Sequence, residues 1–184
     1  VKISKGVSGM KEEAGLVHIY CGDGKGKTSA ALGLALRAAG RGKKVLIVRF
    51  LKNEDSGELI SLRQVPGIRV LPNERNFGFV WKMDEKTKKE AAAWNRLLFE
   101  RAVREAKDSD LLVLDEIMAA VRYGMVPEER VCSFLKSRPR GLEVAMTGRE
   151  PSEALLSLAD YVSEIRNVKH PFDRGIPARA GVEY

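Results

Sequence analysis

Cys21-Gly22-Asp23-Gly24-Lys25-Gly26-Lys27-Thr28-Ser29 is a glycine- and lysine-rich turn that joins two strongly apolar segments. Residues 16–21 before it are rich in β-branched and aromatic side chains, which predicts a buried strand. Residues 28–39 after it are apolar on nearly every side, which predicts a buried helix. A strand, a glycine-rich turn, Gly-Lys-Thr and a helix, in this order, predict a phosphate-binding loop.

The residue types in this loop suit the binding of a triphosphate. Glycines let successive backbone N–H groups turn toward one point, where they form an anion site at the helix N-terminus. Lys27 would add a positive charge near the phosphates, and the Thr28 hydroxyl would be placed to ligate Mg²⁺. The candidate nucleotide-binding residues are therefore Gly22, Asp23, Gly24, Lys25, Gly26, Lys27, Thr28 and Ser29.

The spacing of the loop departs from two common glycine-rich motifs. A Walker A loop has four residues between its first glycine and its Gly-Lys pair, whereas Gly22 and Gly26 enclose three. A dinucleotide-binding G-x-G-x-x-G motif that starts at Gly22 would need a glycine where Lys27 stands. The alternative is a Gly/Lys-rich surface turn, and the strand before the loop and the helix after it favour phosphate binding instead.

The chain is long enough for one domain with a full core. It has 184 residues, of which 44% are hydrophobic and 31% charged, as is typical of globular proteins. We expect residues 15–184 to form that domain and residues 1–14 to be a flexible segment. No apolar run reaches the length of a membrane span and no signal peptide is evident, so we expect a cytoplasmic protein that binds no membrane. Its two cysteines provide neither a disulfide framework nor a zinc spacing.

The net charge is +7, from 32 Lys and Arg against 25 Asp and Glu. Such a balance is compatible with either a nucleic acid or an anionic small molecule as a partner. The basic residues are spread along the chain, and from Lys82 to Lys107 they interleave with acids, as on the solvated face of a helix. Charge alone is therefore weak support for binding DNA or RNA.

Segments of strand and helix character alternate along the rest of the chain, up to a tail at residues 166–184 that lacks a regular pattern. This alternation predicts an α/β fold with a mostly parallel sheet and helices on both faces. Ligands of such sheets bind at the carboxyl ends of the strands. Further strands are expected at 44–50, 68–71, 110–116, 142–146 and 161–165, and further helices at 57–65, 84–107, 128–137 and 151–158.

Two carboxylates, Asp115 and Glu116, end the strand predicted at residues 110–116. In phosphate-loop proteins such a strand end lies beside the loop, and its acid holds Mg²⁺ directly or through water. The candidate metal ligands are therefore Thr28, Asp115 and Glu116. The weaker alternative is an Asp-Glu pair that caps the next helix. Thr147-Gly148-Arg149 is also expected at a strand end of the same site.

Aromatic side chains gather in the loop predicted at residues 72–83, which contains Phe77-Gly78-Phe79-Val80-Trp81. From composition alone, a hydrophobic plug tucked under the loop is slightly favoured. In the helix that follows, Trp94 is expected in the core, because it shares a helical spacing with Ala91, Leu97, Leu98, Ala102 and Val103.

From about Gly15 to Tyr184 the chain resembles the corrinoid adenosyltransferases, a phosphate-loop family that adenosylates cob(I)alamin or cob(I)yrinic acid diamide. Five blocks in the right order carry the resemblance, and a shortened phosphate loop is itself a feature of that family. The blocks are GDGKGKTSAALGLALRAAGRG (Gly22–Gly42), FGFVW (Phe77–Trp81), LDEI with RYG (Leu114–Ile117 and Arg122–Gly124), TGR (Thr147–Arg149) and VKHPFDRGIPARAGVEY (Val168–Tyr184).

The resemblance implies a RecA-like P-loop fold and an unusual use of ATP. Family members face the ribose C5′ carbon toward Co(I) of the reduced corrinoid, and inorganic triphosphate leaves. Lys27 would help to stabilise that leaving group. Phe79 and Trp81 match an aromatic pair beside the corrin that is thought to displace the lower cobalt ligand, which eases reduction of Co(II). Lys27, Phe79 and Trp81 are thus the candidate catalytic residues.

The resemblance extends to cofactors, partners and single positions. Glu116 matches the acid that ligates Mg²⁺ (or Mn²⁺) with Thr28, and Arg37 matches an arginine near the nucleotide. Asp23 stands where relatives often carry Asn, so it would repel the triphosphate unless it bonds the ribose hydroxyls. A reductant such as a flavoprotein and a homodimer are implied, and no nucleic acid is expected. The alternatives left open are an ordinary P-loop ATPase and a nucleotide-dependent regulator that binds nucleic acid.

Overall fold

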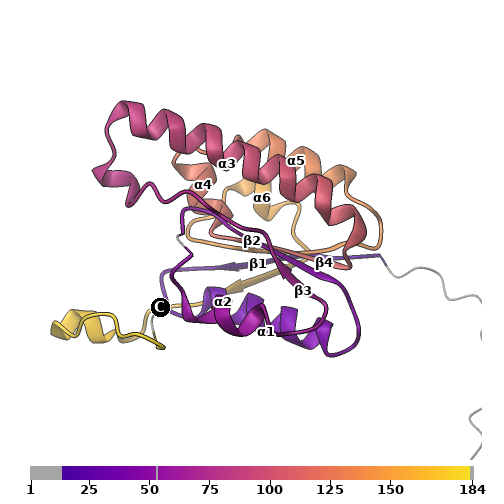
Figure 1. Cartoon of the computed structure of the whole chain (residues 1–184), viewed down its shortest axis with the longest axis horizontal. Helices are drawn as coiled ribbons and strands as arrows, with labels where there is room; N and C mark the ends of the chain where they lie inside the picture. The colour runs from indigo at the N-terminus through magenta and orange to yellow at the C-terminus, as the bar shows by residue number, and fades with distance from the viewer. Residues whose placement is uncertain (1–13, 53, 183–184) are drawn as a thin grey trace, which may run out of the picture.

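A six-stranded sheet forms the centre of a computed structural model that describes residues 14–52 and 54–182 (Figure 1). The strand order is β3-β2-β4-β5-β1-β6, and every strand pair in these ranges is parallel. The predicted α/β fold with a parallel sheet is therefore confirmed. The strands are β1 (Val17–Cys21), β2 (Val45–Arg49), β3 (Ile68–Val70), β4 (Leu111–Asp115), β5 (Glu143–Thr147) and β6 (Tyr161–Glu164).

Helices cover both faces of the sheet (Figure 1). Because both faces are covered, β2 and β4 are buried at every position and read as continuous apolar runs. One face carries α1 (Lys27–Ala39) and α2 (Gly57–Leu62), and the other carries α3 (Glu85–Glu105), α4 (Ile117–Arg122), α5 (Glu128–Ser137) and α6 (Glu153–Leu156). Short 3₁₀ turns are η1 (Val80–Lys82), η2 (Ala106–Asp108) and η3 (Pro171–Arg174).

The long helix α3 begins after Asp84, whose carboxylate accepts a hydrogen bond from the Thr87 N–H at 2.7 Å. Its apolar stripe packs on the sheet through Ala91, Leu98 and Ala102, as the spacing predicts. Leu97 shares that spacing, but its side chain points to solvent while that of Leu98 beside it is buried. Trp94 is only half-buried, so the prediction that it lies in the core is wrong.

Several short elements differ from the prediction. The expected helices at 57–65 and 151–158 shorten to α2 and α6, and α4, η1 and η3 were not anticipated. α4 has six residues, five of them apolar, and is too short for a helical period to show. η3 begins at Pro171 in the tail predicted to be irregular, where His170 Nδ1 accepts from the Phe172 N–H at 3.2 Å.

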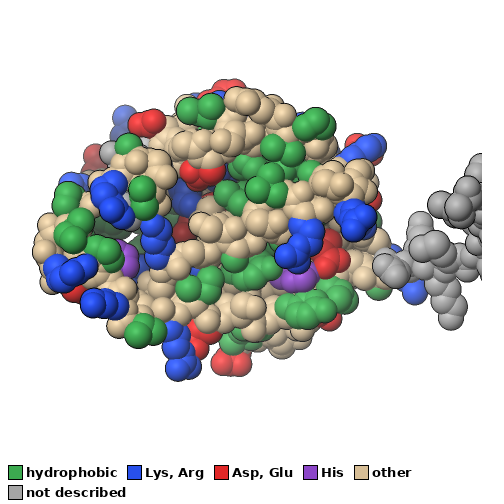
Figure 2. All heavy atoms as spheres, turned by 90° about the horizontal axis from the view of Figure 1, so that it is seen from below, with side chains coloured by type: hydrophobic (Ala, Val, Ile, Leu, Met, Phe, Trp, Pro, Cys, Tyr) green, Lys and Arg blue, Asp and Glu red, His purple; other side chains and the backbone are tan. Residues whose placement is uncertain are grey.

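The predicted flexible segment 1–14 lies, apart from Ala14, outside the described residues. Within the described ranges, no helix is both long and apolar enough to cross a membrane. The face of the molecule shown in Figure 2 carries Lys and Arg side chains that are scattered among acidic and hydrophobic ones rather than massed in one tract.

The strand order decides which segments meet at the carboxyl edge of the sheet. Parallel strands all end at this edge, so the turns after β1, β2, β4 and β5 lie on the same side. These turns carry the phosphate loop, Lys52, Asp115-Glu116 and Thr147-Gly148, respectively. The fold thereby brings four chain segments, distant in sequence, to one site.

Candidate active site

The turn between β1 and α1 has the backbone of a phosphate-binding loop. Gly22 and Gly26 have φ of 106° and 121°, values that L side chains rarely adopt. α1 begins at Lys27, directly after Gly26, and the first N–H groups of a helix lack partners within it. The predicted order of strand, glycine turn and helix is confirmed, so the loop presents a helix N-terminus that favours an anion.

The chain after β6 packs directly against this loop. A Cβ atom at Gly22 would lie 2.3 Å from the carbonyl oxygen of Ile165, and one at Gly24 would lie 2.7 Å from the backbone of Arg166. The Gly24 N–H donates to the same Ile165 oxygen at 2.8 Å. Glycine is therefore required at both positions by the close approach of two backbone segments, in addition to any contact with phosphate.

Asp23 fastens the tail to the loop. Its Oδ1 accepts a hydrogen bond from the Asn167 N–H at 2.8 Å, and this bond lowers the pKa of the exposed carboxyl. Lys25 Nζ donates to the Val182 carbonyl oxygen at 2.9 Å, near the end of the described chain. The tail thus runs along the phosphate loop, and the carboxylate of Asp23 is bonded to protein backbone.

Lys27 lies at the start of α1 with its side chain folded against the loop. The residue is 8% exposed, and its Nζ donates to the Gly24 carbonyl oxygen at 2.8 Å. Burial lowers the pKa of Lys27, because the ammonium loses water; the charge of Arg149 lowers it further, and Glu116 and Asp23 act in the opposite direction. A partly desolvated ammonium interacts more strongly with a bound phosphate than one in bulk water does.

Asp115 is fully buried at the centre of a hydrogen-bond network. Its Oδ1 accepts from the hydroxyls of Thr28 at 2.8 Å and Thr147 at 2.7 Å. Its Oδ2 accepts from Nζ of Lys52 at 2.7 Å. The structure therefore brings Thr28 and Asp115 together as predicted. The capping alternative is wrong for both acids, since α4 has no side-chain cap.

Glu116 turns its side chain toward the loop through an unusual backbone conformation. Its φ of 60° places it in the left-handed region, which non-glycine residues seldom adopt. Its N–H donates to the Thr147 hydroxyl at 2.9 Å, which helps to hold this conformation. Strained residues of this kind gather at functional sites, where the surrounding structure holds them in place.

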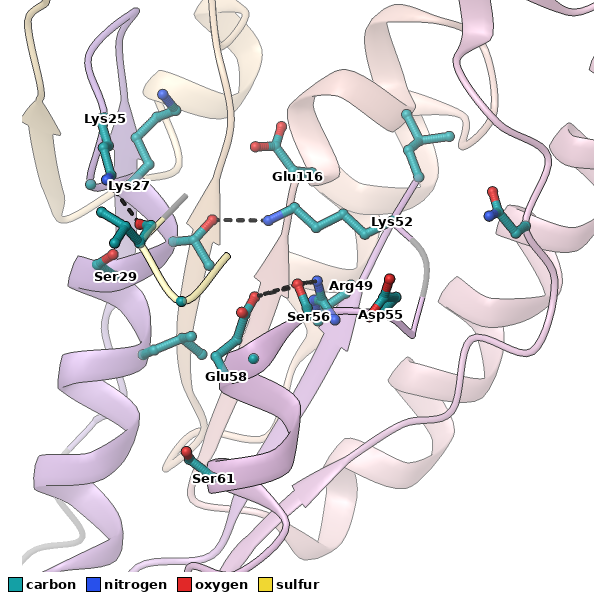
Figure 3. Close-up of a pocket in the computed structure, with 18 of the residues that line it drawn as sticks. Lys25, Lys27, Ser29, Arg49, Lys52, Asp55, Ser56, Glu58, Ser61 and Glu116 are labelled. Carbon is teal, nitrogen blue, oxygen red and sulfur yellow. Dashed lines mark hydrogen bonds and ion pairs between the residues drawn. The ribbon is translucent and has the colours of Figure 1, made fainter. Parts of the chain in front are cut away.

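The phosphate loop, Lys52 and Glu116 border one cavity of about 980 Å³ (Figure 3). Its walls come from the phosphate loop, the segment after β2, α2, the aromatic loop and the tail. The lining residues are Lys25, Gly26, Lys27, Thr28, Ser29, Leu32, Arg49, Leu51, Lys52, Asp55, Ser56, Gly57, Glu58, Ser61, Asn76, Gly78, Phe79, Glu116, Gly181 and Val182.

Phe79 and Trp81 are exposed, so the hydrophobic-plug interpretation is wrong for this pair. Phe79 is 60% exposed and Trp81 70%, and their rings stack with centroids 4.6 Å apart. Phe77 and Val80 beside them are half-buried and pack against the core, which anchors the loop. Phe79 lines the cavity that the phosphate loop borders, and Trp81 extends the aromatic surface beside it.

Arg37 is the one candidate residue that the structure keeps away from the loop. It lies exposed in the last turn of α1, and nine residues of helix place it about 14 Å along the axis from Thr28. Its charge acts on Tyr20 of β1. Lys52 was not predicted as a site residue. It follows the carboxyl end of β2, and the same rule of strand ends that predicted Asp115 on β4 could have found it.

A family model described as ATP:corrinoid adenosyltransferase BtuR/CobO/CobP matches residues 13–184. The chain belongs to this family. It is 37% identical over 185 residues to a corrinoid adenosyltransferase of Escherichia coli strain K12, with 100% of this chain and 92% of the relative covered. The corrinoid adenosyltransferase CobA of Salmonella typhimurium strain LT2 is 36% identical over the same length, with the same coverage.

A corrinoid adenosyltransferase of Pseudomonas aeruginosa is 34% identical over 188 residues, with 99% of this chain and 90% of the relative covered. Among solved structures, the KaiC-like protein PH0186 of Pyrococcus horikoshii OT3 is 18% identical, with 86% of this chain and 74% of that chain covered and a TM-score of 0.48. Family membership makes the chain an enzyme, a corrinoid adenosyltransferase of cobalamin synthesis or salvage that uses ATP as co-substrate.

Proposed function

We propose that a single cavity brings the triphosphate of ATP and the reduced corrinoid together, so that the 5′-deoxyadenosyl group passes to Co(I). The observation that carries the proposal is that the phosphate loop and the exposed ring of Phe79 line the same cavity. In the reaction, an electron pair of Co(I) forms a bond to C5′. The C5′–O bond breaks, and its electrons leave with inorganic triphosphate.

The phosphate loop would serve this leaving group. Breaking the C5′–O bond places additional negative charge on the triphosphate, which oriented donors in a water-poor site stabilise. The N–H groups at the start of α1 and the buried ammonium of Lys27 are such donors. Lys27 is therefore proposed as the catalytic cation of the loop.

The oxygen donors around the loop fit Mg²⁺ or Mn²⁺. Within the described ranges no three His, Cys, Asp or Glu side chains form a metal-holding group. Mg²⁺ commonly binds through one or two carboxylates together with substrate phosphates, rather than in a cage made by protein alone. We assign it to the Thr28 hydroxyl and Glu116, with Asp115 acting through its hydrogen bond to Thr28. When bound, the ion would neutralise charge on the triphosphate.

Phe79 and Trp81 would contact the corrin. The two exposed rings stack into one contiguous apolar surface, the kind of patch that marks an interaction site. A flat corrin face matches their stacked rings, and contact there would keep the lower side of cobalt without a ligand, which eases reduction of Co(II). The proposal includes a reductant such as a flavoprotein, a homodimer and a cytoplasmic location, and it includes no nucleic acid partner.

Product analysis tests the proposal. The enzyme with MgATP and chemically reduced corrinoid should release triphosphate in step with cobalt–carbon bond formation, which changes the corrinoid absorbance. Lys27→Ala should lower the rate at sub-saturating ATP roughly tenfold or more, because a charge-assisted contact is lost. Lys43→Ala, which removes an exposed lysine just before β2, is the matched control. Release of ADP and phosphate without corrinoid would contradict the proposal and indicate an ordinary ATPase.

A further inference from the structure

The ammonium group of Lys52 lies between the two residues that link α1 to β4. Its Nζ is 2.7 Å from Oδ2 of Asp115 and 3.1 Å from Oγ1 of Thr28. Figure 3 shows the side chain reaching from the segment after β2 toward the start of α1. Lys52 therefore places a positive charge beside the N-terminus of α1. This charge comes from the segment after β2, whereas that of Lys27 comes from the first residue of α1 itself.

The backbone that carries Lys52 is fixed by buried contacts. Leu51 has a φ of 54°, a left-handed conformation for a non-glycine residue. The buried amide of Asn73 donates to the carbonyl oxygens of Arg49 at 3.0 Å and Lys52 at 2.9 Å. Trp94 Nε1 in turn donates to Oδ1 of Asn73 at 2.7 Å. These contacts define where the long side chain of Lys52 begins.

The contacts of Lys52 leave it able to meet a ligand. A lysine ammonium has three N–H donors, and the contacts with Asp115 and Thr28 account for two. The side chain is partly exposed and lines the cavity that the phosphate loop borders. A residue that served only to neutralise buried Asp115 would have no need to reach this cavity.

We propose that Lys52 is a second triphosphate-binding lysine, which Asp115 holds in place beside the start of α1. The ligand class is a polyphosphate anion, here the triphosphate of ATP and the inorganic triphosphate released, so the inference rests on the proposed function. With Lys27, it would put two cations around the leaving group. The competing explanation is that Lys52 is only a counter-charge for the buried carboxylate of Asp115.

A double-mutant cycle separates the two explanations. The variants are Lys52→Met, Asp115→Asn and the two combined. Binding of inorganic triphosphate and of adenosine is measured by calorimetry at fixed Mg²⁺. Asp115→Asn keeps a side-chain oxygen that can accept from Lys52, so the lysine stays in place in that background. If Lys52 contacts phosphate, Lys52→Met should therefore weaken triphosphate binding roughly tenfold or more in both backgrounds, with little effect on adenosine.

If Lys52 is only a counter-charge, Lys52→Met should have no effect once Asp115 is replaced, because no buried carboxylate then needs neutralising. That result would overturn the inference. Lys52→Met alone leaves the buried negative charge of Asp115 without its lysine partner, and the loss of stability can be large enough to unfold the protein. In that event, comparing Asp115→Asn with the double variant still decides the question.

Two further variants keep this test separate from that of the proposed function. Lys43→Met removes a lysine just before β2, at the other end of the strand that leads to Lys52, and should leave triphosphate binding unchanged. Lys27→Ala reports on the phosphate loop. If Lys27→Ala weakens binding and Lys52→Met in the Asp115→Asn background does not, only the role of Lys52 is lost. If neither weakens it, the loop does not bind the triphosphate, and both proposals fail.

Discussion

The Asn167 N–H donates to Oδ1 of Asp23 at 2.8 Å, so the chain after β6 is bonded to the phosphate loop across 144 residues of sequence. The negative charge of Asp23 would repel a bound triphosphate, but its carboxylate here accepts a hydrogen bond from the backbone of Asn167. The lowered pKa of Asp23 agrees with this, because the hydrogen bond from Asn167 favours the ionised carboxylate. The tail is therefore attached to the loop that is proposed to bind the nucleotide, and this attachment can be tested.

Asp23→Ala should loosen the tail and raise the KM for ATP on the order of threefold to tenfold, the effect of losing one charge-assisted hydrogen bond. Hydrogen exchange should quicken at the amide of Asn167 and its neighbours. Asp23→Asn is the matched control, because its side-chain oxygen still accepts from Asn167. If both variants change KM equally, the charge of Asp23 matters and the tether does not.

The lowered pKa of Lys27 predicts an early alkaline limit to activity. Lys27 can bind triphosphate as a cation only while protonated, so kcat/KM for ATP should fall as the pH rises through that lowered pKa, below the range of an ordinary lysine. The free energy of unfolding should change in the opposite direction and rise with pH over the same range. The burial penalty of the ammonium is fully present below the folded-state pKa and is relieved as the pH rises toward the unfolded-state value.

The comparison that isolates this effect is Lys27→Arg, because a guanidinium stays charged throughout the accessible pH range. The measurement is kcat/KM from neutral to alkaline pH for both proteins, normalised to each one's neutral value. The early limit should be missing from the arginine variant. The same limit in both proteins would assign it to another group.

Glu116→Gln should raise the Mg²⁺ concentration needed for half-maximal activity, since an amide is a weaker ligand for a hard cation than a carboxylate. The backbone need not change, because Gln is isosteric and the left-handed conformation is held by the bond to Thr147. Glu150→Gln is a suitable control. Glu150 is also left-handed, but it is exposed, pairs with Arg122 and does not line the cavity. An unchanged Mg²⁺ titration for Glu116→Gln would remove this residue from the proposed metal site.

Local sequence predicts the parts of this site whose cause is local. The phosphate loop follows from glycines between a strand and a helix, and α5 follows from its helical periodicity, with the observed bounds Glu128–Ser137 equal to the predicted ones. The acids at the end of β4 follow from the rule that ligands bind where parallel strands end.

The remaining parts depend on tertiary contacts that no window of sequence contains. Lys52 is held through Asn73, which lies 21 residues further along the chain. Composition favours burial for Phe79 and Trp81, because apolar rings usually leave water. The structure shows that Phe77 and Val80, half-buried in the same loop, make the contacts with the core and leave Phe79 and Trp81 exposed.

Truncation of Phe79 or Trp81 separates corrinoid binding from nucleotide binding. Because both rings are largely exposed, Phe79→Ala and Trp81→Ala should leave the melting temperature and ATP binding nearly unchanged. Turnover from Co(II) corrinoid should fall strongly if, as proposed, the aromatic contact eases reduction on the enzyme. Supplying chemically generated Co(I) should restore much of the rate, because the nucleophile no longer has to be made on the enzyme.

Phe77→Ala is the matched control, because Phe77 belongs to the same loop but packs against the core. A large core side chain costs roughly 3–5 kcal/mol when truncated to alanine, and a half-buried one should cost less while still lowering the melting temperature. Its losses should be equal from Co(II) and Co(I), following the folded fraction. The assignment of Phe79 and Trp81 to the corrinoid site fails if their variants behave in the same way. A rate that is low from Co(II) but restored from Co(I), at an unchanged melting temperature, is the outcome that only a contact with the corrin explains.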